Sequence, residues 1–147
     1  MRDATQKAYA SLRLFSDDLD PSTVTTQLEI APDHTHRRGE RRVTRTIKGK
    51  CVAYGPYSSN LWSMSSKAWI QSHRLETHLA WLLNEIETKT DIFRRLQADG
   101  WKADAFCYSL GPNKPAIPRK LTERFGALGI EIIIDHYASD EPGEAQP

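Results

Sequence analysis

The stretch LETHLAWLLNEI, residues 75–86, shows the clearest periodicity in the sequence. Its leucines and its final isoleucine recur at helical spacing and form one apolar stripe, which predicts an amphipathic helix lying against a core. Ser72 is the predicted N-cap of this helix. A second helix is predicted directly after it, over residues 90–98, with Gly100 at its C-terminal end.

Alternating and β-branched runs on both sides of these helices predict strands. Strands are expected at residues 9–15, 42–47, 60–68, 101–110 and 130–137. The last of these is rich in isoleucine, which favours a central place in a sheet. Asp20 and Pro21 predict the start of a short helix that ends near Glu29. A further helix is expected from Pro118 to Leu128.

In chain order, the predicted elements are strand, helix, irregular segment, strand, helices, strand, helix and strand. This order divides into two βαβ-like halves, residues 9–68 and 75–137. We therefore expect an α+β fold, with a mixed, mostly antiparallel sheet and helices packed on one face. The chain of 147 residues suits a single domain over residues 9–137, with a flexible N-terminus at 1–8 and a disordered tail at 138–147.

The composition excludes several classes of protein. Hydrophobic residues make up 39% and charged residues 27% of the chain, which argues against collagen, coiled coil and wholesale disorder. No apolar run is long enough to span a membrane and no secretory signal is visible, so a cytoplasmic location is expected.

The sequence offers no motif for a cofactor, a metal or a catalytic group. Cys51 and Cys107 lack metal-ligand spacing, which gives a zinc site or a disulfide little support. Cys107 is expected to be a small buried hydrophobe within a strand. There is no P-loop, no dinucleotide-binding fingerprint, no nucleophile elbow and no helical zinc motif. We therefore predict no catalytic residue, no cofactor and no metal.

The total charge of +1 conceals a strongly basic segment. Residues 32–60 are the least regular part of the chain, and residues 34–50 within them, here called the basic arm, carry seven basic residues and one acid. The basic arm thus has a charge of +6, and the rest of the chain has −5. Such an arm either contacts an acidic partner, a protein or a nucleic acid, or is a solvated loop with an edge strand. The predicted contact residues are Arg37, Arg38, Arg41, Arg42 and Arg45.

Two further side chains are candidate binding residues. Trp62 follows the basic arm and is either one wall of a cleft or a core aromatic. His78 flanks the apolar stripe and is either a base or ligand at a pocket rim, or a boundary histidine hydrogen-bonded to a nearby loop. Our first expectation is a non-enzymatic binding module that contacts its partner through the arm and the Trp62 strand. The alternative is a small-ligand binder or an enzyme with a cleft around Trp62 and His78.

Short landmarks in a fixed order resemble a known bacterial family. They are Leu12-Arg13-Leu14-Phe15, Asp20-Pro21, Gly39-Glu40, Trp62 with Ser65 and Ser66, Leu75-Glu76-Thr77-His78-Leu79, Leu82-Leu83 and Leu128-Gly129-Ile130. The set is similar to the family called domain of unknown function 4279, over residues 9–137. The resemblance implies a small, stand-alone bacterial α+β protein, and it carries over no activity and no cofactor.

Overall fold

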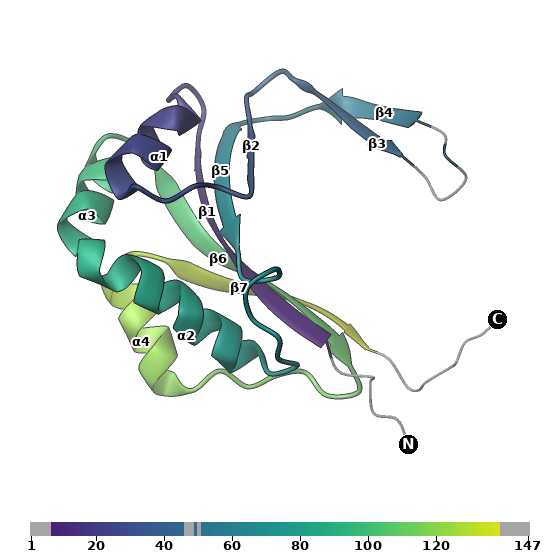
Figure 1. Ribbon diagram of the computed structural model, residues 1–147, viewed down its shortest axis with the longest axis vertical. Coiled ribbons are helices and arrows are strands. Elements are labelled where there is room, and N and C mark those ends of the chain that lie inside the picture. The colour runs from purple at the N-terminus through teal and green to yellow at the C-terminus, as the bar shows by residue number, and fades with distance from the viewer. Residues whose placement is uncertain (1–6, 46–48, 50, 139–147) are drawn as a thin grey trace.

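The computed structural model describes residues 7–45, 49 and 51–138, except for the side chains of residues 42–45 and 51–54 (Figure 1). The predictions for residues 1–6, 46–48, 50 and 139–147 lie outside the described residues. In chain order, the elements are β1 (Lys7–Ser16), α1 (Pro21–Leu28), β2 (His34–His36), β3 (Arg41–Arg45), β4 (Cys51–Pro56), β5 (Asn60–Ser65), α2 (Leu75–Ile86), the 3₁₀ turn η1 (Glu87–Lys89), α3 (Thr90–Ala98), β6 (Lys102–Gly111), α4 (Arg119–Ala127) and β7 (Glu131–Ala138).

Five strands form the main sheet, in the order β2-β5-β1-β6-β7. In this described sheet β6 and β7 run parallel, and the other neighbouring pairs are antiparallel. The predicted α+β fold, with a mixed and mostly antiparallel sheet, is confirmed. α4 joins β6 to β7 as a true βαβ unit. β1 and β5 instead pair antiparallel, so the first predicted half has the element order of a βαβ unit without its parallel strands.

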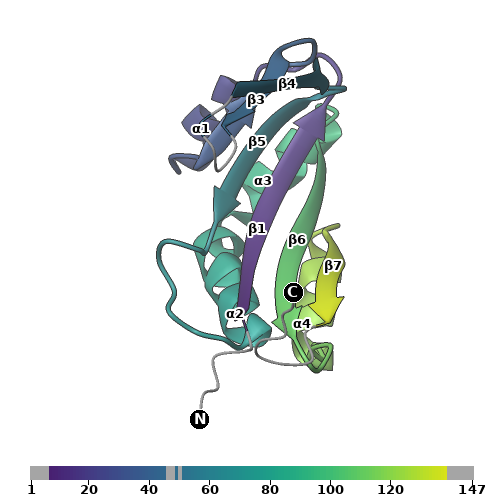
Figure 2. The same ribbon diagram turned by 90° about the vertical axis from the view of Figure 1, so that its right-hand side faces the viewer.

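The helices cover one face of this sheet, and the other face is open (Figures 1 and 2). Along β1 the side chains alternate between the two faces. Ala10, Leu12 and Leu14 are fully buried, whereas Ser11 and Arg13 are only partly buried on the open face. Burial of each leucine contributes about 1.5–3 kcal/mol, so the covered face supplies most of the apolar stabilisation of the sheet. α2 adds its predicted stripe to this core through Leu75, Leu79, Leu82, Leu83 and Ile86.

The helices begin and end largely at the predicted residues. α2 and α3 have the predicted bounds, and Gly100 follows α3 with a left-handed φ of 121°. Asp20 caps α1 by accepting the backbone N–H of Ser22 at 2.9 Å. The predicted cap of α2 was wrong, because its N-cap is Arg74 and Ser72 instead accepts the Arg74 N–H in the preceding turn. Within the described residues, no helix combines the length and the apolar character needed to cross a bilayer.

The last strand does not lie where its composition suggested. The isoleucines of β7 favour a central strand, yet β7 forms an edge of the main sheet beside β6. Ile132 and Ile134 pack on the core, and the strand is half-buried or exposed along its length. β-branched residues fit any half-buried pleated surface, so their abundance does not report a position within the sheet.

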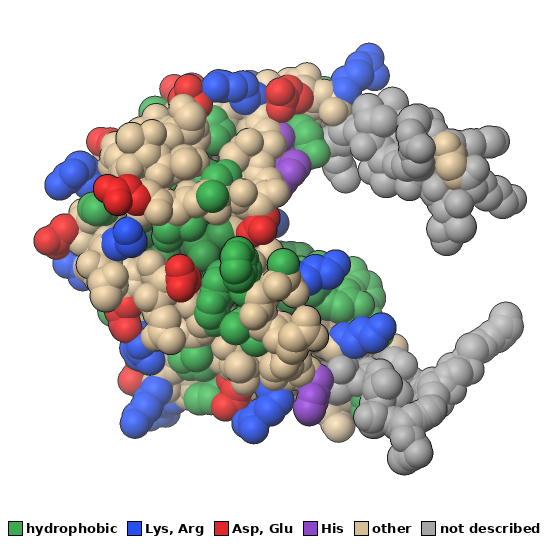
Figure 3. All heavy atoms as spheres, viewed as in Figure 1, with side chains coloured by type: hydrophobic (Ala, Val, Ile, Leu, Met, Phe, Trp, Pro, Cys, Tyr) green, Lys and Arg blue, Asp and Glu red, His purple; other side chains and the backbone are tan. Residues whose placement is uncertain are grey.

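The basic arm divides between two sheets. Its first part, β2, pairs with β5 in the main sheet, whereas its second strand, β3, forms a separate hairpin with β4, which follows the arm. The strand predicted at 42–47 corresponds to β3, and the short strands β2 and β4 were not predicted. The hairpin projects from one end of the main sheet, on the side without helices (Figure 1). The space-filling view shows this side of the molecule hollowed between the base of the hairpin and the open face, and this hollow is here called the concavity (Figure 3).

Candidate binding surface

His78 lies in the interior and is 1% exposed. Its Nδ1 is 2.6 Å from Ser66 Oγ, and its Nε2 is 2.8 Å from the carbonyl oxygen of Ser72. Ser66 Oγ already accepts the backbone N–H of Ala10 at 3.0 Å. Because the carbonyl oxygen of Ser72 can only accept, Nε2 carries the proton and donates to it, and Nδ1 of the neutral ring accepts from the Ser66 hydroxyl. Both ring nitrogens of His78 are thus used to hold the loop after β5 against β1 and α2.

Trp62 also lies in the core and is 0% exposed. Its indole N–H donates to Thr25 Oγ1 of α1 at 3.0 Å, which satisfies the polar atom of the buried ring. A small-ligand binder or an enzyme that used a cleft around Trp62 and His78 would need His78 to be open to solvent. That condition is not met, because the interface between the helices and the sheet encloses both side chains.

A buried amide holds the base of the basic arm. Asn60, at the start of β5, is 5% exposed. Its Oδ1 accepts the backbone N–H of Arg38 at 2.5 Å, and its Nδ2 donates to the carbonyl oxygen of Leu19 at 2.8 Å. This amide therefore ties three separate segments together and sets the direction in which the arm leaves the body.

An ion pair adds a second tie between the arm and α1. Nη2 of Arg37 lies 2.9 Å from Oδ1 of Asp20, and the backbone N–H of Arg37 donates to Oε1 of Glu40 at 2.7 Å. Hydrogen bonds from Ser22, and then from Arg37, hold the pKa of Asp20 below its ordinary value. Arg37 is thus engaged with the body at neutral pH.

The other predicted arginines lie farther along the arm. Arg38 and Arg41 are exposed at the base of the hairpin. Arg42 and Arg45 belong to β3, and their side chains lie outside the described part of the chain. The structure places the predicted arginines on one continuous segment, while it directs Trp62 and His78 into the core.

The open sheet face carries aromatic side chains that are not among the predicted binding residues. Tyr9 and Tyr108 stack with ring centroids 5.1 Å apart, and the Tyr137 ring follows at 5.7 Å from that of Tyr108. The Arg13 guanidinium lies 4.5 Å from the centroid of Phe106. Strand alternation was the signal that could have found them, because the core residues of β1 and β6 place these side chains on the opposite face.

A bidentate ion pair crosses this face from β1 to β6. Nε and Nη2 of Arg13 donate to the two carboxylate oxygens of Asp104 at 2.8 Å and 2.7 Å. Asp104 is 5% exposed, and the fork of Arg13 satisfies its carboxylate. Hydrogen bonding to Asp104 raises the pKa of Arg13. The pair therefore leaves the middle of the face without net charge at this position.

A hollow of about 290 Å³ lies where the open face meets the base of the hairpin, lined in part by Arg13 and Phe15. His36 and Tyr57 also line it, and their rings stack with centroids 3.3 Å apart. His34 Nε2 lies 2.9 Å from His36 Nδ1. Over the described residues, no group of three or more His, Cys, Asp or Glu side chains could hold a metal ion. This corner is therefore an aromatic surface beside the arginines of the arm.

Cys107 is a buried hydrophobe, as predicted, and is 0% exposed. Burial raises the pKa of its thiol to about 12, with a further contribution from the charge of Asp104. The thiol is therefore protonated at neutral pH and is a poor nucleophile.

These features define an α+β domain whose sheet has one helix-covered face and one open, aromatic face beside a basic hairpin. A family model described as Domain of unknown function (DUF4279) matches residues 6–139. The chain belongs to this family, which confirms the resemblance seen in its short landmarks. No curated protein and no solved structure matches the chain.

Proposed function

We propose that this protein is a non-enzymatic interaction module, which holds an acidic surface of a partner protein between the basic arm and the open sheet face. The observation that carries the proposal is the concavity between the base of the hairpin and the open sheet face (Figure 3). Tyr9, Tyr108 and Tyr137 form a row of ring contacts on this face. A convex acidic element of a partner would meet cations and aromatic rings together in such a space.

The charge of the arm supports an acidic partner. The arm carries +6 against −5 for the rest of the chain. Its base is held by the amide of Asn60 and by the Arg37–Asp20 pair. Arg38 and Arg41 are exposed, and within the described residues neither has an ion pair. Their charges are therefore available to steer and hold a partner of opposite sign.

The open face favours a protein over a nucleic acid. Tyrosine and arginine are enriched at the centres of protein interfaces, where they supply large contact areas with polar tips. Nucleic-acid-binding domains are usually strongly basic, whereas this chain carries only +1 in total. Neighbours already occupy much of the ring surface that bases would stack on, since Arg13 covers Phe106 and Tyr9 stacks on Tyr108.

The same proposal places the module in the bacterial cytoplasm. A reduced, buried Cys107 suits a reducing compartment. The proposal requires no cofactor, no metal and no catalytic residue.

The test compares a variant with reversed charges on the arm with a control variant that carries the same number of charge reversals elsewhere. The arm variant replaces Arg38, Arg41 and Arg42 with glutamate and spares Arg37, whose loss would break the pair with Asp20. The control variant makes the same change of charge on the helical layer, at Arg94, Arg119 and Lys120. Partners are captured from the source cell, identified, purified and titrated against each variant by calorimetry.

We expect the arm variant to bind the purified partner at least about 100-fold more weakly, because several charge pairs become repulsive. The control should bind within about twofold of the original chain, and thermal unfolding should remain close to that of the original chain for both variants. Equal binding by the arm variant would overturn the proposal. Loss of capture after nuclease treatment would also overturn it, in favour of a nucleic acid partner.

A second variant tests the sheet face separately from the arm. Tyr137 is 51% exposed at the end of the aromatic row, so Tyr137→Ser should change stability little. We expect roughly tenfold weaker binding, the usual order for an aromatic contact residue at an interface. Unchanged binding would restrict the contact to the arm and remove the sheet face from the proposal.

A further inference from the structure

β1 extends past the end of its neighbour β5. The last β1–β5 pair joins Ser11 to Ser65, while β1 continues toward the N-terminus with its other edge still paired to β6. Ser66 closes the ladder, because its N–H donates to the carbonyl oxygen of Ala10 and its Oγ accepts the N–H of Ala10. Backbone groups two residues apart point to the same edge of a strand. The N–H and C=O of Ala8 therefore point to the edge where β5 has already ended.

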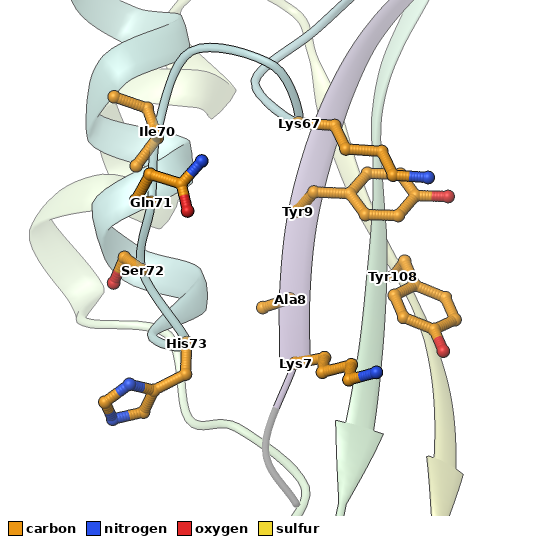
Figure 4. A pocket seen from close by; sticks show the side chains of 9 residues that line it. All are labelled: Lys7, Ala8, Tyr9, Lys67, Ile70, Gln71, Ser72, His73 and Tyr108. Atoms are coloured by element: carbon orange, nitrogen blue, oxygen red, sulfur yellow. The ribbon is translucent and has the colours of Figure 1, made fainter. Parts of the chain in front are cut away.

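A hollow of about 760 Å³ lies along this edge, where no other described strand pairs with β1, and is here called the edge hollow (Figure 4). Lys7, Ala8 and Tyr9 of β1 line one side, and Ile70 and His73 of the loop after β5 line the other. In Figure 4 the loop stands off from the strand, and the side chain of Ala8 points toward the loop. An unpaired strand edge is a template for another strand unless something covers it.

The loop wall of the edge hollow is anchored at two points. The Ser66–His78–Ser72 network ties the loop to β1 and α2. The ring of Trp69 lies parallel to that of Trp81 on α2, with centroids 6.5 Å apart. The hollow therefore exists before any ligand arrives, which lowers the entropy cost of binding.

The described residues that line the edge hollow include cations but no acid. Lys7, Tyr9 and Lys67 lie on one side of β1 in Figure 4, and Ile70 lies on the other. Lys67 Nζ is 5.2 Å from the centroid of Tyr9. An added strand directs alternate side chains to opposite sides. Its acidic side chains would meet the lysines, and its apolar side chains would meet Ile70.

We propose that the edge hollow binds an extended acidic peptide segment of a partner protein, which adds to the edge of β1 by hydrogen bonds to the backbone of Ala8. Strand addition derives its affinity from main-chain hydrogen bonds and its specificity from alternate side chains. The edge hollow lies at the opposite end of β1 from the basic arm, so this inference does not depend on the function proposed for the concavity.

The test starts from a phage-displayed library of random octapeptides, panned on the full chain. Enriched sequences should alternate acidic and apolar residues. Synthetic peptides with the enriched sequences should bind the double variant Lys7→Glu/Lys67→Glu at least about tenfold more weakly than they bind the original chain. The matched control, Lys102→Glu/Lys114→Glu, changes the charge equally outside the edge hollow and should bind normally. The proposal is overturned if no peptide is enriched, or if enriched peptides bind both variants equally.

Amide hydrogen exchange then tests the strand addition itself. The N–H of Ala8 should exchange quickly in the free chain and at least about tenfold more slowly when the enriched peptide is bound. Tyr9 is the internal control, because its backbone groups face β6 and should be protected in both states. Bound peptide with Ala8 still exchanging quickly would exclude strand pairing. The Ala8→Pro variant lacks this edge N–H and should bind the peptide more weakly than the original chain. The exchange experiment uses the original chain, so its result stands even if the proline variant does not fold.

Discussion

The two faces of the main sheet are formed by the same strands but differ in the kind of side chain that they carry. On the covered face, β1 contributes Leu12 and Leu14 to a closed apolar core. On the open face, the same strand contributes Tyr9 and Arg13, which make ring stacking and a bidentate ion pair. The covered face supplies the apolar core, and the open face carries polar and aromatic groups that contact one another at the surface. The comparison teaches that alternate residues of one strand build the core and the polar, aromatic surface that we propose as a binding face.

The largest expected effect comes from two neighbours on β1 that face opposite ways. Leu14→Ala should lower the free energy of unfolding by about 3 kcal/mol, because it leaves a cavity in a closed core. Phe15→Ala removes more atoms but should cost only about 1 kcal/mol, because Phe15 is partly exposed beside a hollow. Urea unfolding measures both. Equal losses of unfolding free energy would contradict the conclusion that the covered face contributes more to stability than the open face.

The next effect concerns the polar network within the covered layer. His78→Ala should lower the free energy of unfolding by about 2 kcal/mol, because Ser66 and Ser72 lose a buried partner. Ser66→Ala should cost a similar amount, and the double variant should cost clearly less than the sum. His73→Ala serves as the control, since His73 is exposed and should change stability little. Additive losses would mean that the two side chains do not form one network.

The smallest expected effect is the pH dependence that Cys107 contributes. Burial raises its pKa from 9.0 to about 12, so the folded state retains a proton that the unfolded state loses above pH 9. The contribution of Cys107 to stability is therefore fully present below pH 9 and is lost as the pH rises toward 12. Between neutral pH and pH 9.5, the free energy of unfolding should fall by about 1 kcal/mol more in the chain with Cys107 than in the Cys107→Ala variant. Both chains carry Cys51→Ser, so that Cys107 is the only thiol that differs.

Thiol labelling checks the same prediction directly. In the Cys51→Ser background, the native chain should react with a thiol reagent only as fast as it unfolds, and denaturant should release one fast-reacting thiol. Rapid labelling of the native chain at pH 8 would contradict the burial of Cys107 on the covered face.

The helices were predictable because their signals are local. The stripe of α2 and the cap formed by Asp20 each depend on residues within a few positions of one another. The alternation of β1 likewise indicated which residues enter the core. β7 was placed wrongly within the sheet, because strand order depends on contacts between segments far apart in sequence.

The candidate site was only partly predictable. The arginines of the arm were visible as a charge run, and whether they bind a partner stays a prediction. His78 looked like a candidate for chemistry because its partners, Ser66 and the Ser72 carbonyl, depend on the path of the loop. The tyrosines of the open face come from three strands, so the sequence does not display them as a group.

By itself, the sequence determined the α+β class, the family, the bounds of α2 and α3 and the +6 charge of the arm. These follow from composition and from spacings within a turn or a strand. Only the tertiary structure decided that His78 is an internal tie and that the tyrosines gather on one face. It also decided that, among the described strands, none pairs with the edge of β1 beside Ala8. The physical reason is that burial and strand pairing are set by residues brought together from distant parts of the chain.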